Sequence, residues 1–241
     1  MAVTIEEIKK LRETTGVSMT ACKTALEEAG GDFEKAIDIL RMKGEAKAAD
    51  RAGRSTGQGA IVVKSDGKKS AMVTLLCETD FVARGDDFLK IARDLPDVKE
   101  AVLKLGENVQ VGEMKIVEGD NVGNYVHSNR KIGVLVSLQG GSGEIAKDIA
   151  MHIAATNPEV ISPDEVSADL LEREKGIWRE QLKNEDKPAE IVEKIMIGKE
   201  KKFREENALI KQIFVKDPEK TIEQLLKEAD AIVKEFKRFA I

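Results

Sequence analysis

The stretch IVVKSDGKKSAMVTLL, residues 61–76, decides the fold. Two runs of apolar and β-branched residues flank Ser65-Asp66-Gly67, and an Asp-Gly pair between such runs is a strong signal for the tight turn of a β-hairpin. From Val82 to about Leu95 the apolar spacing changes to that of a helix. The order strand, turn, strand, helix predicts an antiparallel sheet covered by a helix.

The same order of elements recurs farther along the chain. A shift of 63 residues without a gap aligns Val63 with Val126, Val73 with Val136, Leu75 with Leu138, Val82 with Ile145 and Ala83 with Ala146. Residues 108–119, NVQVGEMKIVEG, alternate in part and predict a further strand between the two copies. The repeat indicates two related subdomains, each a sheet plus a helix, packed together.

The first 50 residues or so predict three short helices with a small core. Apolar residues recur every three or four positions, the pattern breaks at Gly16 and at Gly30-Gly31, and Ser18 and Asp32 are suited to helix N-caps. Such a bundle is of the ubiquitin-associated type, and a core this small is more often a docking module than an active site. The Gly-studded stretch 44–59 predicts a helix tail and then a linker.

The last third of the chain is mostly helical by pattern. Two long charged helices that break between Asn184 and Pro188 predict a projecting helical hairpin. TIEQLLKEADAIVKEFKRF, residues 221–239, predicts a terminal helix. The expected fold class is α+β, with an N-terminal module over 1–54, a first core subdomain over 55–140 and a second over 141–241, whose hairpin starts near residue 120.

Composition narrows the function. Charged residues make up 34% and hydrophobic ones 41%, which is a globular composition. Aromatic residues at 4% and a net charge of −5 argue against base-stacking or phosphate-backbone binding, so no direct nucleic-acid contact is expected. No run approaches the roughly 18 apolar residues of a membrane span, and there is no leader pattern. Two distant cysteines fit a reducing cytoplasm.

Catalytic and ligand-binding motifs are missing. The phosphate-cradle and zinc patterns are absent, so neither a cofactor nor a metal is expected. Cys77 with His127 or His152 is a formal nucleophile pair, but a thiol at the end of an apolar strand is typically inert. Glu78 and Asp80 could act in acid–base chemistry, but acids at a helix start are more commonly caps. The residues favour a binding protein over a hydrolase that uses Cys77 or Asp80.

One aromatic residue stands in an unusual place. Phe81 directly follows Asp80 at the polar exit of the apolar run 72–77, whereas a core Phe normally lies inside such a run. The residue either packs under the sheet at the start of a helix or is displayed for a partner. In the second copy Glu144 takes its position, so the scaffold does not need an aromatic there. The repeat therefore favours display.

Four stretches together resemble the elongation factor Ts family, the nucleotide-exchange factors of the translational GTPase elongation factor Tu. They are LRETTGVSMTACKTALEEAGGDFEKAIDILRMKG (11–44), CETDFVAR (77–84), KIGVLVSL (131–138) and IAMHIAATNP (149–158). The resemblance runs in order from about Ile5 to Ala240. It implies an N-terminal three-helix module, two related subdomains and a projecting hairpin.

The resemblance also implies the activity. Members bind the GDP form of elongation factor Tu and speed the release of GDP, so they are not enzymes with catalytic residues of their own. By analogy Phe81 would wedge into an apolar pocket between Tu helices, Asp80 would disturb the surroundings of Mg²⁺, and Thr79 and Val82 would shape the turn. Further Tu contacts would involve Leu11, Arg12 and Met19 in the bundle, and Ile132, Gly133 and His152 in the second subdomain.

Several alternatives stay open at this point. Thr20 and Ala21 stand where the family commonly has a second Met and an acid, which bears on the bundle's contact. Met19 is equally suited to the bundle core, His152 to a satisfied buried position and Gly133 to strand packing. A homo-oligomer is compatible with the sequence. A ubiquitin-like or nascent-chain binding module without exchange activity is the second candidate function.

Overall fold

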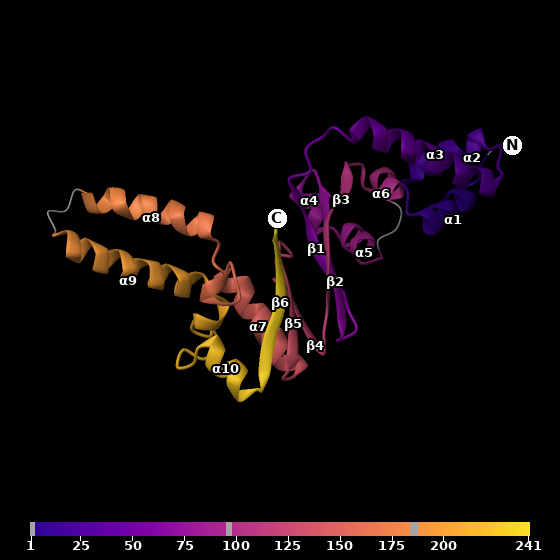
Figure 1. Ribbon diagram of the computed structural model, residues 1–241. Coiled ribbons are helices and arrows are strands. Elements are labelled where there is room, and N and C mark those ends of the chain that lie inside the picture. The colour runs from indigo at the N-terminus through magenta and orange to yellow at the C-terminus, as the bar shows by residue number, and fades with distance from the viewer. Residues whose placement is uncertain (1–2, 95–97, 184–187) are drawn as a thin grey trace.

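The computed structural model describes residues 3–94, 98–183 and 188–241. A helical bundle, a core of two sheets with their helices, and a projecting pair of helices follow one another along the chain, with the bundle and the pair on opposite sides of the core (Figure 1). The α+β class is thus confirmed. The boundaries near residues 54 and 140 stay predictions.

The bundle consists of α1 (Ile5–Thr15), α2 (Met19–Glu28) and α3 (Phe33–Arg51). Each helix starts at a capping side chain, because Thr4, Ser18 and Asp32 accept hydrogen bonds from backbone N–H groups of the first turn. The buried core residues are Ile8, Leu11, Val17, Cys22, Ala25, Leu26, Ala36 and Leu40. Leu103 of α6 (Val98–Leu105) packs against this core and joins the bundle to the first subdomain.

The first subdomain is an antiparallel sheet in the order β1-β2-β3, formed by β1 (Gln58–Ser65), β2 (Lys69–Cys77) and β3 (Val109–Glu118). Side chains of α4 (Asp80–Arg84), α5 (Asp86–Asp94) and α6 pack on one face of the sheet. The helix predicted from Val82 starts two residues earlier and breaks at Gly85, whose backbone is extended. Its predicted end at Leu95 lies outside the described residues.

The second subdomain repeats the first. Its sheet, in the order β4-β5-β6, contains β4 (Asn121–Val126), β5 (Ile132–Gly140) and β6 (Ala231–Ala240), and it packs against α7 (Gly143–Thr156) and α10 (Ile222–Glu228). The starts of β1, β2 and α4 at 58, 69 and 80 recur at 121, 132 and 143, an offset of 63 each time. This offset confirms the predicted repeat.

The prediction of a terminal helix over 221–239 is wrong. Only Ile222–Glu228 is helical, Asp230 has a left-handed φ of 47°, and Ala231–Ala240 forms β6. The segment has apolar residues at helical spacing, but β5 offers a free edge, and pairing with that edge gives hydrogen bonds to the backbone groups of β6 that face β5. Tertiary pairing overrides local propensity here.

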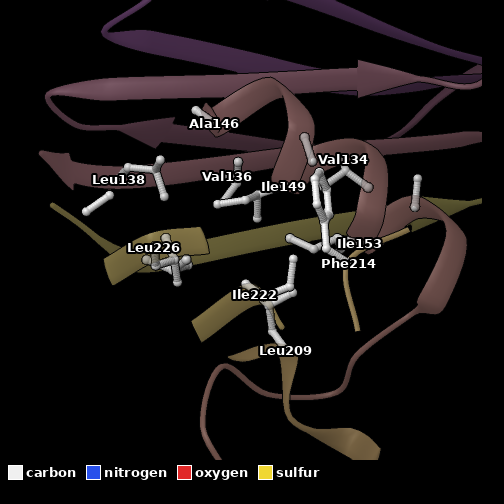
Figure 2. Close-up of a cluster of buried hydrophobic side chains, with 14 residues drawn as sticks. Val134, Val136, Leu138, Ala146, Ile149, Ile153, Leu209, Phe214, Ile222 and Leu226 are labelled. Atoms are coloured by element: carbon white, nitrogen blue, oxygen red, sulfur yellow. The ribbon is translucent and has the colours of Figure 1, made fainter. Parts of the chain in front are cut away.

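Three apolar layers hold the core together. Figure 2 shows the second subdomain's cluster, in which Ile149 and Ile153 of α7 lie against Val134 and Val136 of β5, with Phe214 beside them. A matching cluster lies beneath the helices of the first subdomain. The residues buried between the two sheets are Ile61, Met72, Val117, Val122, Leu135 and Phe239.

Gly133 is needed where the two sheets meet. A Cβ at this position would lie 2.5 Å from the side chain of Ile61 and 2.7 Å from the sulfur of Met72. The glycine therefore lets β5 approach the other sheet closely, as the packing alternative for this residue predicts.

The predicted helical hairpin is confirmed as α8 (Ala168–Lys183) and α9 (Ala189–Asn207). Residues 184–187 of the predicted break lie outside the described part of the chain. The rings of Trp178 and Phe203 meet edge to face with centroids 5.7 Å apart, and Glu200 pairs with Lys175 at 2.9 Å. Within the described residues no helix is long and apolar enough to cross a membrane.

Candidate functional site

The turn after β2 carries the candidate site and begins with a helix cap. Thr79 is the N-cap of α4, since its Oγ1 accepts a hydrogen bond from the N–H of Val82 at 3.3 Å and its carbonyl accepts one from Ala83 at 3.2 Å. Ala83 is buried against the sheet. The cap therefore fixes the orientation of the residues between Thr79 and Ala83.

A carboxylate from a distant loop fastens this turn. Glu107, between α6 and β3, accepts hydrogen bonds from the backbone N–H groups of Glu78 and Thr79, both at 3.0 Å, and from the hydroxyl of Thr79 at 2.5 Å. Three bonds to one carboxylate leave the start of α4 little freedom.

Glu78 ties the same turn to two further segments. Its carboxylate accepts a hydrogen bond from the N–H of Asn108 at 2.6 Å and pairs with Arg54 at 3.3 Å. The hydrogen bond from Asn108, together with Arg54, lowers the pKa of Glu78 below its ordinary value. Asn108 in turn donates its side-chain N–H to the carbonyl of Arg54 at 2.9 Å. The sequence analysis missed these supporting residues, because contacts across 24 or more positions leave no local pattern.

Phe81 is displayed on this fastened turn. Its side chain is 86% exposed, more than any other large hydrophobic residue in the described part of the chain. Moving an exposed Phe side chain into an apolar environment is favourable by roughly 1.5–3 kcal/mol, and this free energy is not gained while the ring stays in water. The structure excludes packing of Phe81 in the core and leaves its side chain exposed to solvent.

Asp80 and Val82 flank the exposed ring. The carboxylate of Asp80 is 43% exposed and pairs with Arg84, one helical turn later, at 3.2 Å. Val82 is half-buried and packs against the first subdomain's core. The turn thus presents an apolar ring next to an accessible carboxylate.

The thiol of Cys77 is not suited to nucleophilic chemistry. The side chain is fully buried and donates a hydrogen bond to the carbonyl of Thr79 at 3.3 Å. Burial, with the nearby charge of Glu107 as a second cause, raises the pKa of Cys77 to about 11. The thiol is therefore neutral near pH 7, which removes the main support for a hydrolase.

His152 is buried and satisfied rather than exposed. Its Nε2 lies 3.0 Å from Oε1 of Gln212, and its Nδ1 accepts a hydrogen bond from the N–H of Val215 at 3.4 Å. This arrangement corresponds to a neutral ring, and burial lowers the pKa of His152. The histidine holds the segment on which Ile213 and Val215 are exposed, at 61% and 45%.

The other candidate residues are distributed over different parts of the molecule. In the bundle, Leu11 is fully buried, Met19 is half-buried against the core and Arg12 is exposed. In the second subdomain Ile132 is half-buried and Gly133 lies between the sheets. The candidates that lie next to one another in a single turn are Thr79, Asp80, Phe81 and Val82. Of the three candidates in the bundle, Leu11, Arg12 and Met19, Arg12 is the exposed one. Among the described residues no group of three or more His, Cys, Asp and Glu side chains could hold a metal ion.

Comparison with known proteins gives one answer. The family model described as "Elongation factor TS" matches residues 96–241. Proteins named elongation factor Ts from Hydrogenobaculum sp. (strain Y04AAS1) and Pseudomonas fluorescens are 44% and 46% identical, over 100% and 99% of this chain and 99% and 90% of their own lengths. That of Hydrogenovibrio crunogenus is 41% identical over 100% of this chain and 92% of its own. The chain belongs to the elongation factor Ts family of translation elongation factors.

Proposed function

We propose that this protein is a guanine-nucleotide exchange factor for elongation factor Tu. It binds the GDP form, promotes the release of GDP by disturbing the site of Mg²⁺ and phosphate, and stays bound to nucleotide-free Tu until GTP enters. The observation that carries the proposal is Phe81, a large apolar side chain 86% exposed on a turn that Glu107 and Thr79 hold in place.

The proposed mechanism uses Phe81 as a wedge. A side chain whose backbone is already fixed loses less entropy when it enters an apolar pocket of the partner, and a desolvated aromatic anchor is the kind of residue that dominates an interface. Asp80 then arrives beside the nucleotide's Mg²⁺, whose positive charge is the largest local attraction for the diphosphate. Disturbing that ion weakens the binding of GDP to Tu.

The effects of GDP and of this protein on each other's binding to Tu are reciprocal. If binding of this protein lowers the affinity of Tu for GDP by some factor, GDP lowers the affinity of Tu for this protein by the same factor. The factor therefore needs no acid, base or nucleophile of its own, which agrees with the neutral thiol of Cys77. We infer that it acts in the cytoplasm, where its partner works, and not as an enzyme.

Two other surfaces complete the proposed contact. Arg12 and the exposed part of Met19 form the surface of the bundle that contacts the GTPase domain. The buried Leu11 packs beneath this surface. His152 acts by positioning the segment that exposes Ile213 and Val215, which we assign to the contact with a second Tu domain. Direct nucleic-acid binding has no part in this function.

Release of a fluorescent GDP from a bacterial elongation factor Tu tests the proposal. The wild type should accelerate release strongly, and Phe81→Ala should lose most of that acceleration. Met114→Ala, at another exposed apolar residue on β3, is the control and should behave like the wild type. Binding to Tu without acceleration would favour the binding-module alternative, and no binding by the folded protein would refute the partner.

A further inference from the structure

A charged cleft lies directly beside the exposed turn. It opens between α4 of the first subdomain and the turn that joins β4 to β5 in the second, and has a volume of about 540 Å³. The polar residues that line it are Asp80, Arg84, Ser128, Asn129, Arg130 and Lys131. Three cations and one carboxylate therefore face a single space, and Asp80 belongs to both the cleft and the turn.

The cations of the cleft are not equally available. Arg84 pairs with Asp80 at 3.2 Å, and Lys131 donates a hydrogen bond to the side chain of Gln58 at 2.6 Å. Among the residues that the structure describes, the guanidinium of Arg130 has neither an ion pair nor a hydrogen bond. Arg130 is thus the group best placed to receive an anion.

The backbone holds Arg130 in this position at some cost. Its N–H donates to the carbonyl of His127 and its carbonyl accepts from the N–H of Ile61, both at 2.8 Å, so both subdomains fix it. Its φ is 57°, in the left-handed region that favours glycine. Such a conformation in a non-glycine residue is a reason to look for function.

The repeat shows that the fold does not require arginine here. With the offset of 63, Arg130 corresponds to Gly67, which has a φ of 91° in the first hairpin. One hydrogen bond of the turn recurs, because Lys131 donates its N–H to the side chain of Asn129 at 2.9 Å, just as Lys68 does to Asp66. The second turn is two residues longer, with β4 ending at Val126 and β5 starting at Ile132. The second copy has therefore replaced the favoured glycine by a cation that faces the cleft.

We propose that this cleft receives a carboxylate side chain of the GTPase partner, with Arg130 as its main ligand. The proposal rests on the proposed function, since a partner segment next to the Phe81 pocket would lie within reach of the cleft. A single carboxylate matches the planar fork of an arginine. A phosphate group carries more negative charge and would lie close to the carboxylate of Asp80, which makes it the poorer occupant.

The test measures how fast this protein associates with the GDP complex of elongation factor Tu. Arg130→Lys should keep the rate within about 2-fold, Arg130→Gly should lower it about 3-fold and Arg130→Glu about 10-fold, and added salt should shrink these differences. Lys64→Glu is the matched control. It makes the same change of charge three residues along β1 from Ile61, whose N–H bonds to Arg130, so it lies about 10 Å from that contact and outside the lining of the cleft, and should have less than a 2-fold effect.

Arg130→Gly also guards against a folding artefact. Because it restores the residue that the first copy uses, its melting midpoint should equal or exceed that of the wild type while its association is slower. Equal effects of Arg130→Glu and Lys64→Glu would overturn the proposal, because only net charge would then matter. So would competition by millimolar inorganic phosphate that disappears in Arg130→Gly, because the occupant would then be phosphate.

The same measurements separate this proposal from the proposed function. A wild type that binds Tu without speeding the release of GDP contradicts the exchange function but leaves the Arg130 series readable. A wild type that does not bind Tu overturns both. A Phe81→Ala protein that still associates at the wild-type rate but fails to release GDP would support the division of roles between wedge and cleft.

Discussion

The two copies of the strand–turn–strand–helix unit share their fold and differ at the residues of the proposed contact. Both cap the helix after the hairpin in the same way, with Thr79 accepting from Val82 and Ser142 from Ile145, each at 3.3 Å. Directly after the cap the copies diverge, because the first displays Phe81 where the second has Glu144. The shared positions build the scaffold and the unshared ones carry the proposed function.

The helices after the two caps differ in length for a visible reason. Residues 143–156 form one continuous helix, α7, buried along one face, whereas the first copy stops at Gly85 and restarts as α5. Glu107 then fastens only the short first piece. A short, fastened α4 can present a side chain to solvent without disturbing the packing of Phe88 and Ile91 on α5 beneath it.

The largest effect should come from making the first copy resemble the second. Phe81→Glu removes an exposed side chain, so the free energy of unfolding should stay within about 0.5 kcal/mol of the wild type. Loss of a central aromatic anchor costs 2 kcal/mol or more, so exchange should slow by about 30-fold or more. Urea unfolding and GDP release measure the two effects on the same samples.

The reverse substitution, Glu144→Phe, sharpens the same comparison. It places a ring at the equivalent position of α7 but lacks the fastening that Glu107 provides, so it should not restore exchange to Phe81→Glu. Restored exchange in the double variant would mean that an exposed ring suffices and that its position on a fastened turn is irrelevant.

Removing the fastening should give the next largest effect. Glu107→Ala deletes three hydrogen bonds to Glu78 and Thr79, each worth about 1 kcal/mol in a partly exposed setting, so unfolding should become easier by about 1–3 kcal/mol. Exchange should slow as well, because a turn that is no longer held by Glu107 loses more conformational entropy when Phe81 binds. Glu113→Ala on the exposed β3 is the control, and equal losses in both variants would contradict the fastening.

The second copy has its own polar anchor, and pH should reveal it. Burial lowers the pKa of His152, so the unfolded chain binds a proton at this residue before the folded one does. Stability is therefore complete above the ordinary histidine pKa of about 6.5 and falls as the pH drops below it, by at most about 1.4 kcal/mol per pH unit. Urea unfolding between pH 7.5 and 5 measures the slope. His152→Gln should flatten it, whereas the exposed His127→Gln should not.

The sequence predicts most of this scaffold because its hairpins combine apolar, β-branched runs with a turn signal and repeat at a constant offset. It does not predict β6. The helical spacing of apolar residues that starts at Ile222, Leu225 and Leu226 continues through the residues that form this strand. The free edge of β5 decides the structure of that segment, and an edge is a property of the folded sheet.

Some residues of the candidate site can be predicted from the sequence and others cannot. The mismatch between Phe81 and Glu144 in the repeat indicates display before any coordinates are consulted, and the equivalent mismatch between Arg130 and Gly67 would have marked the cleft. Glu107 and Arg54 could not be found, because a carboxylate that accepts bonds from a turn almost 30 positions earlier has no spacing rule. Differences between repeats thus report on function, and long-range polar contacts need the structure.

The smallest expected effect compares the two caps directly. Thr79→Ala and Ser142→Ala each remove a side chain that accepts a hydrogen bond from the first turn of a helix. Ser142→Ala should lower the free energy of unfolding by about 1 kcal/mol, and Thr79→Ala by about 1 kcal/mol more, because its hydroxyl also donates to Glu107. Thr79→Ala should also slow exchange by a few fold, because its helix carries Phe81, whereas Ser142→Ala should leave exchange unchanged. Urea unfolding gives the first quantity and GDP release the second. If Ser142→Ala slowed exchange as much as Thr79→Ala, loss of stability alone would account for both, and the first copy would have no special role in releasing the nucleotide.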